Sequence, residues 1–344
     1  MEKEVLLTKK IYWRGSHLHF TTDLGKPWVS PLGKLPKSTI QYLHDFGWKK
    51  VDENTNEIPI FSFMTRKCGD FSLQSPCPTI RQFPIKITDL LDDKIQLFVN
   101  MKKFDFEYCL PQTFIDFKSF DIFYTEEKQD NKRFFVKHKW GVKGKSVYPL
   151  RNFEEIKKHF KEGQHIIQKE VIPYLINERK FVVRVHVLVL CDPFEIYVHQ
   201  NCIVLSHGEK YDENNDKKDI HVSSAGKNLP IPFLLNTLKI LYDKTFPQIK
   251  KIAYESISII QSSLISIENT KLFHLFGYDF IVDKNEKVIL LEINSYPALG
   301  NGTMNKVPKQ IFEEMLIDFV NLAVLPVTDN KEKQIGRFVK TEKD

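Results

Sequence analysis

Three oxygen-bearing side chains, Asp279, Glu292 and Asn294, stand in an otherwise apolar stretch and are the first candidates for chemistry in this sequence. Two carboxylates on one apolar face would repel each other and would be costly to remove from water. A hard cation resolves both difficulties, because Mg²⁺ prefers carboxylate and amide oxygens and is usually shared with the phosphates of a nucleotide. The sequence therefore predicts a magnesium site. The alternative is a solvated segment whose acidic residues merely face water.

The element that must position these side chains is a β-hairpin. Residues 278–283 and 288–293 are rich in Ile, Val, Leu, Phe and Tyr, and the residues between them include no apolar side chain. This pattern is typical of two strands joined by a turn. If the last residue of the first run faces the first residue of the second, Asp279 lies directly opposite Glu292, so both side chains point to the same face. Asn294 joins them because side chains alternate along a strand.

A basic, glycine-containing loop is the second candidate site. Residues 133–137, RFFVK, predict a strand, and the segment HKWGVKGKSVY follows it. The glycines and lysines of this loop are Gly141, Gly144, Lys139, Lys143 and Lys145. A lysine at the end of a strand and others on a loop can surround a triphosphate, since glycines permit close backbone approach. The spacing does not match a Walker loop, and a basic surface hairpin is the alternative.

The strongest predicted strand covers residues 179–190, RKFVVRVHVLVL. Side-chain alternation places Lys180, Val182 and Arg184 on one face and the intervening apolar residues on the other. Two cations on one face either protect a sheet edge against aggregation or bind phosphate. Both interpretations fit the sequence.

The remaining elements follow from apolar periodicity and turn residues. Helices are expected at residues 36–48, 88–101, 153–160, 233–246, 249–267 and 308–325, and strands at 4–7, 11–13, 58–64, 165–171 and 195–205. The polar segment 206–228 has the length of a functional or mobile loop. The charged tail from residue 328 is expected to be frayed.

Length and composition describe an ordinary globular chain. Its 344 residues are 42% hydrophobic and 27% charged, which suits two or three domains with well-formed cores. The N-terminal apolar run is too short for a signal peptide, and no run approaches the ~20 residues of a membrane span, so we expect a cytoplasmic protein without membrane contact. The net charge of +6 comes from lysines spread along the chain. We expect no nucleic-acid binding, because no basic stripe is interleaved with aromatic residues.

Taken together and in this order, these stretches resemble the tubulin tyrosine ligase and tubulin tyrosine ligase-like family, which has the ATP-grasp fold. KHKWGVKGKSV resembles the family's phosphate-covering strand and loop, IIQKEV its adenine hinge, RKFVVRVHVLV its K-F-x-x-R strand, and HLFGYDFIVDKNEKVILLEIN its metal hairpin. The resemblance implies an α+β protein in which two α+β subdomains grip ATP. The expected parts are a small N-terminal α/β domain at 1–65, ATP-grasp subdomains at 66–175 and 176–327, and a charged tail at 328–344.

Carried over residue by residue, the resemblance implies a nucleotide site and a metal site. The contacts to the ATP phosphates would come from Lys137, Lys143 and Gly144. Lys180 would reach the nucleotide, and Arg184, the catalytic residue, would face the reacting carboxylate and the γ-phosphate. The adenine hinge would consist of Gln168, Lys169, Glu170 and Val171. The Mg²⁺ ligands would be Asp279, Glu292 and Asn294, in agreement with the hairpin geometry.

The resemblance also implies an ATP-dependent ligase that forms a carbon–nitrogen bond. ATP would phosphorylate a carboxylate of a protein acceptor to an acyl phosphate, and the amine of a free amino acid would then attack it to give an amide. Because carboxylate, triphosphate and metal are all charged, positioning and charge neutralisation would carry most of the catalysis. The acidic tail of tubulin is a candidate acceptor, which would associate the protein with the cytoskeleton.

Five positions depart from the family's pattern. Val182 stands in place of the Asp of K-F-D-x-R, and Leu205 in place of a second Arg. Gln200 replaces a basic residue, Ser146 a loop glycine, and Ser224 the Asn of H-x-T-N. Loss of an arginine removes a bidentate partner for a carboxylate, a contact worth ~2 to 5 kcal/mol in binding, so tyrosine ligation to tubulin itself is disfavoured. The alternative function is a pseudo-ligase that acts as a nucleotide-binding or scaffold protein.

Overall fold

The computed structural model describes most of the chain. The described residues are 10–13, 16–19, 26–29, 37–50, 61–62, 79–129, 131–141, 144, 146–222, 229–264, 270–299, 304 and 306–343. The strand predicted at 4–7, most of that predicted at 58–64, and the residues Lys143, Lys145 and Ser224 lie outside this set. Within it, no helix combines the length and apolar character needed to cross a membrane.

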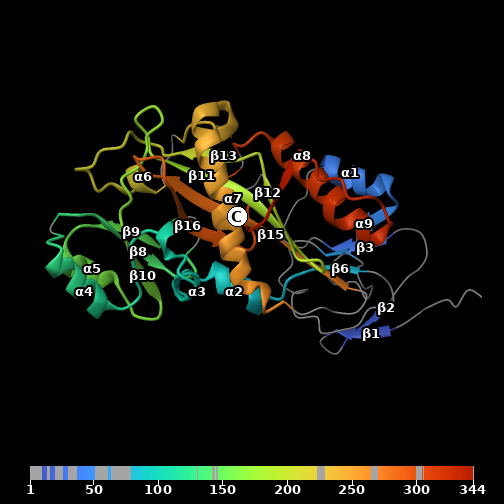
Figure 1. Cartoon of the computed structure of the whole chain (residues 1–344), viewed down its shortest axis with the longest axis horizontal. Coiled ribbons are helices and arrows are strands. Elements are labelled where there is room, and N and C mark those ends of the chain that lie inside the picture. The colour runs from blue at the N-terminus through green and yellow to red at the C-terminus, as the bar shows by residue number, and fades with distance from the viewer. Residues whose placement is uncertain are drawn as a thin grey trace, which may run out of the picture.

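A large mixed sheet forms the centre of the molecule (Figure 1). Its two longest strands, β11 (Phe181–Cys191) and β15 (Thr270–Val282), are antiparallel neighbours. β16 (Val288–Asn294) pairs with β15, while β12 (Glu195–His199) and β13 (Ile203–Ser206) both pair with β11. β11 is therefore an internal strand, and the interpretation of its two cations as protection of a sheet edge is wrong.

Shorter strands extend this sheet on both sides. Beyond β15 follow, all in parallel, β6 (Thr79–Gln82), β5 (Phe61–Ser62), β3 (Lys26–Val29) and β4 (Trp48–Lys50). On the other side β14 (Phe233–Leu234) pairs with β13, and β17 (Phe338–Thr341) pairs with β12. β1 (Lys10–Trp13) and β2 (Ser16–His19) form a separate pair. The mixed α+β class is confirmed, whereas the expected domain boundaries stay a prediction.

Helices cover both faces of the large sheet because β11 alternates between two hydrophobic cores. Val183, Val185 and Val187 share one core with apolar residues of α2 (Ile85–Asp92) and α7 (Lys239–Gln261), and Figure 1 shows α7 lying across β11 and β15. Leu188 and Leu190 share the other with α1 (Lys37–Asp45) and α8 (Lys309–Phe319). Each fully buried side chain of this kind favours folding by about 1.5 to 3 kcal/mol, so β11 and β15 are held rigidly under the site.

A second, four-stranded antiparallel sheet lies beside the first. Its order is β7 (Thr113–Phe114), β10 (His165–Lys169), β8 (Phe134–His138) and β9 (Val147–Leu150). α4 (Phe117–Glu126) and α5 (Phe153–His159) pack on it through an aromatic core around Phe120 and Phe134. The strands predicted at 133–137 and 165–171 and the helix predicted at 153–160 are confirmed with shifted or shortened ends.

The helix predicted at 88–101 is in fact two helices, α2 and α3 (Lys94–Lys103). Asp93 separates them: its backbone is extended, and its side chain accepts hydrogen bonds from the backbone N–H groups of Ile95 and Gln96. This is the geometry of a helix N-cap. The break brings Lys94 to the first position of α3, where its side chain is buried.

The prediction of two helices at 233–246 and 249–267 is also wrong, because most of these residues form one helix. Residues 239–261 form the single helix α7, with Pro247 inside it, and residues 233–237 form β14 and a 3₁₀ turn (Leu235–Thr237). An interior proline removes one helical hydrogen bond and costs ~3 kcal/mol. Burial of Phe246 and Ile249 on either side of it offsets that cost.

The C-terminal half differs from expectation in three further places. Residues 200–202 interrupt the strand predicted at 195–205 and divide it into β12 and β13. The helix predicted at 308–325 consists of α8, a π-helical turn (Val320–Val324) and α9 (Leu325–Thr328). The tail is not frayed throughout, because β17 pairs with β12 and buries Phe338. In the polar segment 206–228, a short helix, α6 (Lys218–His221), is present.

Candidate active site

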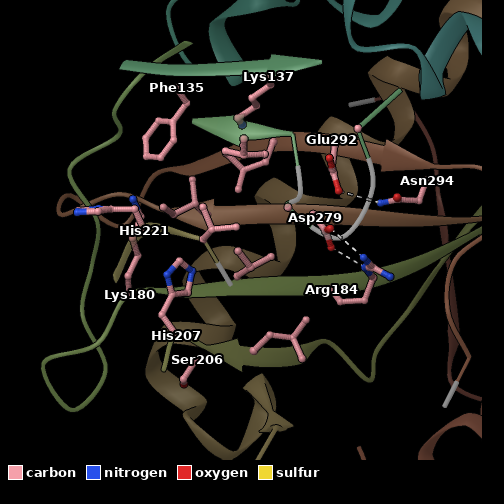
Figure 2. A pocket seen from close by; sticks show the side chains of 18 of the residues that line it. Phe135, Lys137, Lys180, Arg184, Ser206, His207, His221, Asp279, Glu292 and Asn294 are labelled. Atoms are coloured by element: carbon pink, nitrogen blue, oxygen red, sulfur yellow. Dashed lines mark hydrogen bonds and ion pairs between the residues drawn. The ribbon is translucent and has the colours of Figure 1, made fainter. Parts of the chain in front are cut away.

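A cavity of about 860 Å³ lies between the two sheets (Figure 2), which is a typical size for a small-ligand site. β8 and β10 of the small sheet contribute one wall, and β11, β13, β15 and β16 of the large sheet contribute the other. The predicted site residues that line it are Lys137, Gly144, Gln168, Lys169, Val171, Lys180, Arg184, Asp279, Glu292 and Asn294. Glu170 does not line it, and Lys143 is outside the described residues.

The hairpin of β15 and β16 places Asp279 directly opposite Glu292, as predicted. The register at the turn nevertheless differs from the one assumed, since Val282 faces Val288. A β-bulge next to Asp279 inserts one extra residue, Leu291, into β16 and compensates for this shift. Without the bulge, Asp279 would face Leu291 and Glu292 would point to the other side of the sheet.

Both acids have cationic partners. Arg184 is the cross-strand neighbour of Asp279 and donates to both carboxylate oxygens, with Nη2 2.8 Å from Oδ2. Lys94 Nζ lies 3.0 Å from Glu292 Oε2. The amide nitrogen of Asn294 donates to the backbone oxygen of Gly277 at 3.3 Å. Arg184 and Lys94 therefore hold the two acids in place and supply positive charge where a bound metal ion would supply it.

The two carboxylates titrate in opposite directions. Burial alone would raise the pKa of Glu292, but the charges of Lys94 and Lys137 outweigh burial and hold this pKa at about 2. Burial raises the pKa of Asp279, and repulsion by Glu292 raises it further against the attraction of Arg184. Repulsion between neighbouring carboxylates is what a bound cation relieves.

Lys94 is a site residue that the sequence analysis missed. Besides its ion pair with Glu292, its Nζ donates to the backbone oxygen of Gly141 at 3.3 Å, so it links the acids to the loop after β8. Burial opposes its charge, yet the ion pair with Glu292 raises its pKa above the ordinary value. The available signal was the pair Asp92 and Asp93 directly before it, which is unusual in the middle of an amphipathic helix and marks the start of α3.

Lys137 is the cation best placed for a phosphate. It projects from β8 toward the acids (Figure 2), and burial lowers its pKa to about 8 in spite of the attraction of Glu292. In the described part of the chain its Nζ has no ion pair, because Glu292 is paired with Lys94. Gly144, with a φ of +63°, lies on the same wall. A phosphate group in the cavity would supply the missing negative charge.

Gln168, at the expected hinge, lines the cavity and carries a buried acceptor. The Thr113 hydroxyl donates to Pro111 O at 2.6 Å and accepts from the Gln168 side-chain nitrogen at 3.0 Å. This chain of bonds fixes the orientation of the amide, so that Oε1 is the free end. Oε1 is buried and has no hydrogen-bond partner among the described residues, which suits a ligand that carries an N–H or O–H donor.

Glu170 lies behind the cavity wall in a cluster of charges. Its carboxylate is 2.5 Å from Arg133, 3.2 Å from Lys180 and 3.4 Å from His221. Burial opposes ionisation, but the proximity of His221 and the charges of Lys180 and Arg133 lower the pKa of Glu170 to about 2. Glu170 therefore positions Lys180, which does line the cavity.

The two main departures from the family's pattern meet each other in space. Val182 on β11 and Leu205 on β13 are directly opposite cross-strand partners, and both line the cavity. They form an apolar patch on the wall between Lys180 and Arg184. Their pairing was not predicted, because 22 residues, among them the whole of β12, lie between them along the chain.

The donor set fits Mg²⁺ by its chemistry. No group of three His, Cys, Asp or Glu side chains that could hold a metal occurs within the described ranges, and the third predicted ligand is instead the amide of Asn294. Carboxylate and amide oxygens are hard ligands, and Mg²⁺ completes its shell with water and phosphate. The ammonium of Lys137 and the side-chain oxygen of Gln168, which have no partner among the described residues, fit the phosphates and the nucleoside of ATP.

The protein thus has a mixed α+β fold with a charged cavity between two sheets. The family model described as "Tubulin-tyrosine ligase family" matches residues 71–226 and 234–333, which contain every cavity residue named above. The chain belongs to the tubulin-tyrosine ligase family.

Similar curated proteins are enzymes named for tubulin modification. Tubulin polyglutamylase TTLL6 of Homo sapiens is 24% identical over 302 residues, covering 73% of this chain and 32% of that protein. Tubulin glycylase 3C of Tetrahymena thermophila is 27% identical over 228 residues, covering 58% and 21%. The probable alpha-tubulin polyglutamylase Ttll1 of the same species is 23% identical over 269 residues, covering 68% and 64%. The chain spans less than two thirds of the length of each of these relatives.

Proposed function

We propose that this chain is an ATP-dependent carboxylate–amine ligase that joins an amino acid to a carboxylate of a protein. The observation that carries the proposal is the arrangement of charges across one cavity: Lys137, which has no ion pair with any described residue, on one wall, and Asp279 beside Glu292 on the other. This arrangement complements a metal-bound triphosphate. The family and the names of the relatives support tubulin as the acceptor, glutamate or glycine as the amino acid, and a cytoplasmic, cytoskeleton-associated location.

The chain's own residues would hold and neutralise the reactants in an ATP-grasp arrangement. Lys137 and Lys180 would contact the nucleotide, while Asp279, Glu292 and Asn294 would hold Mg²⁺. The ion supplies positive charge next to the phosphates when it is bound. Arg184 would turn from Asp279 toward the acceptor carboxylate and the γ-phosphate. ATP would transfer its γ-phosphoryl group to the carboxylate, giving an acyl phosphate and ADP. The amine of the amino acid would then attack the acyl carbon, form the amide and release inorganic phosphate. Since all reactants are charged, electrostatic positioning would supply most of the rate enhancement.

Calorimetric titration of ATP and of a non-hydrolysable analogue, with and without Mg²⁺, tests the site. We expect Mg²⁺-dependent binding that Asp279→Ala abolishes. Glu286→Ala is the matched control, because Glu286 lies in the turn of the same hairpin, where it pairs with Lys244 outside the cavity. Absence of binding at millimolar nucleotide, or equal binding by Asp279→Ala, would contradict the assignment. Incubation with tubulin, ATP and either glutamate or glycine, read by mass spectrometry, then tests ligation.

A second candidate function is a nucleotide-binding scaffold without ligase activity. The apolar pair Val182 and Leu205 favours it, since neither side chain can hold a carboxylate or a nucleotide hydroxyl. Mg²⁺-dependent nucleotide binding without hydrolysis or amino-acid transfer to any acidic peptide would favour the scaffold. Turnover that is lost in Arg184→Ala while nucleotide binding persists would favour the ligase.

A further inference from the structure

His207 is a buried side chain of the cavity wall that the proposed mechanism leaves unused. It follows β13 directly, and its backbone N–H donates to the backbone oxygen of Lys180 at 2.8 Å, so it lies beside Lys180. Only 1% of its surface is exposed, and it lines the cavity (Figure 2). It belongs to the polar segment 206–228, and the sequence alone predicted no role for it.

The hydrogen bonds of the ring fix its protonation. Nδ1 lies 2.9 Å from the backbone oxygen of Ile220, and because a carbonyl oxygen only accepts, Nδ1 carries the hydrogen. Burial and the charge of Lys180 lower the pKa of His207 to about 3, so the ring is neutral at physiological pH. Nε2 therefore presents a lone pair. It has no hydrogen-bond partner among the described residues, which is unfavourable for a buried acceptor unless a ligand satisfies it.

The position of His207 indicates which part of a ligand it meets. His207 lies opposite Lys180, directly after the end of the neighbouring strand β13. Lys180 is four residues before Arg184, which is the cross-strand partner of Asp279. At roughly 3.3 Å per residue this is about 13 Å from the acids. Val182 and Leu205, which offer no polar side-chain atom, occupy the wall between. His207 therefore lies toward the hinge side of the cavity, since Lys180 pairs with Glu170, which follows β10 directly. A nucleotide with its phosphates at the acids and its base at the hinge around Gln168 would bring its sugar to this part of the wall.

We propose that His207 Nε2 accepts a hydrogen bond from a ribose hydroxyl of the bound nucleotide. The inference rests on the proposed function, since it requires a nucleotide in this cavity. His207 would thereby recognise a nucleotide hydroxyl, which Val182 cannot do because its side chain has no polar atom. Because the ring is neutral, it would distinguish ribose from deoxyribose without adding charge beside Lys180.

Titration of ATP, 2′-deoxy-ATP and 3′-deoxy-ATP in the presence of Mg²⁺ tests this role. A neutral hydrogen bond corresponds to an affinity ratio of about 3 to 10, so we expect the wild-type protein to bind one deoxynucleotide more weakly than ATP by this factor. His207→Asn should bind ATP and that deoxynucleotide with equal affinity. Its amide nitrogen can replace Nδ1 as donor to Ile220, so the local fold is kept while the group at Nε2 is lost. His207→Gln, which retains an acceptor near Nε2, should recover part of the ratio.

His186→Asn is the matched control, because His186 is equally buried and its Nε2 also has no described partner, but it does not line the cavity. It should keep the wild-type ratio. Equal wild-type affinity for ATP and both deoxynucleotides would overturn the inference while leaving the nucleotide site intact. An unchanged ratio in His207→Asn would overturn it as well. Weaker binding of inosine triphosphate that disappears in His207→Asn would instead assign Nε2 to the adenine amine. Failure of every nucleotide to bind would refute the proposed function itself.

Discussion

Replacing Glu170 with glutamine tests the charge cluster behind the cavity. The carboxylate is shared by Arg133, Lys180 and His221, and both cations are almost fully buried. Arg133 keeps Asp216 as a second partner at 2.8 Å, whereas Lys180 has no other ion pair in the described structure. Removing one partner of a buried ion pair costs about 3 to 5 kcal/mol, because the remaining charge is left uncompensated. We expect the lower end of this range, since Arg133 stays paired.

The titration of Glu170 gives an independent magnitude. Burial opposes ionisation, but its partners hold the pKa at about 2 instead of the usual 4.5. At 1.36 kcal/mol per pH unit, this difference corresponds to about 3 kcal/mol. Because the pKa is depressed in the folded state, this stabilisation is fully present above pH 4.5 and is lost as the pH falls toward about 2.

Urea unfolding of both proteins at pH 7, 4 and 3 measures the effect. We expect Glu170→Gln to lower the free energy of unfolding by about 3 kcal/mol at pH 7 and the difference to shrink in acid. Glu178→Gln is the control, because its ion pair with Lys210 is exposed and should contribute little. Equal stability of Glu170→Gln and wild type at pH 7, or a difference that is as large at pH 3 as at pH 7, would refute the reasoning.

Three further predictions concern the cavity and the tail. Lys137→Met should weaken nucleotide binding by about tenfold or more without lowering the melting temperature, because burial outweighs the attraction of Glu292 for the removed charge; calorimetry and thermal unfolding check both, and unchanged affinity would contradict it. Val182→Asp and Leu205→Arg should each destabilise the protein, while the double variant should regain about 0.5 to 3 kcal/mol through direct cross-strand pairing; additive urea-unfolding energies would show no such contact. Truncation after Asn330 removes β17 and the burial of Phe338, worth about 1.5 to 3 kcal/mol, and an unchanged melting temperature would be inconsistent with that strand.

The acid pair of the metal hairpin was predictable because its geometry is local. Two apolar runs around a charged turn define a hairpin, and the period of two then decides which side chains share a face. The register was nevertheless assumed one residue off at the turn, and the bulge at Leu291 restored the pairing of Asp279 with Glu292. A bulge leaves no mark in apolar periodicity, so this agreement was partly fortuitous. The end of α1 was likewise predictable from local sequence, since Gly47, with a φ of +77°, follows it.

The features that the sequence did not predict depend on contacts between distant segments. Lys94 belongs to the site because its Nζ lies 3.0 Å from Glu292 on β16, and only the capping residue Asp93 hinted at its position. α7 continues through Pro247 because its apolar face is buried against the sheet. Glu170 was assigned to the hinge by resemblance, but its partners Arg133 and Lys180 turn it away from the cavity. Secondary-structure propensity and apolar periodicity do not predict these tertiary interactions.

The pairing of β17 with β12 also bears on how the chain folds during its synthesis. His199 pairs with Phe338, so a long stretch of chain must be translated after β12 before its partner exists. At elongation rates of about 5 to 20 residues per second, this interval lasts on the order of ten seconds. During it, β12 presents an open strand edge that another chain can pair with. The nascent protein is therefore more prone to aggregation than the finished one until residues 338–341 leave the ribosome.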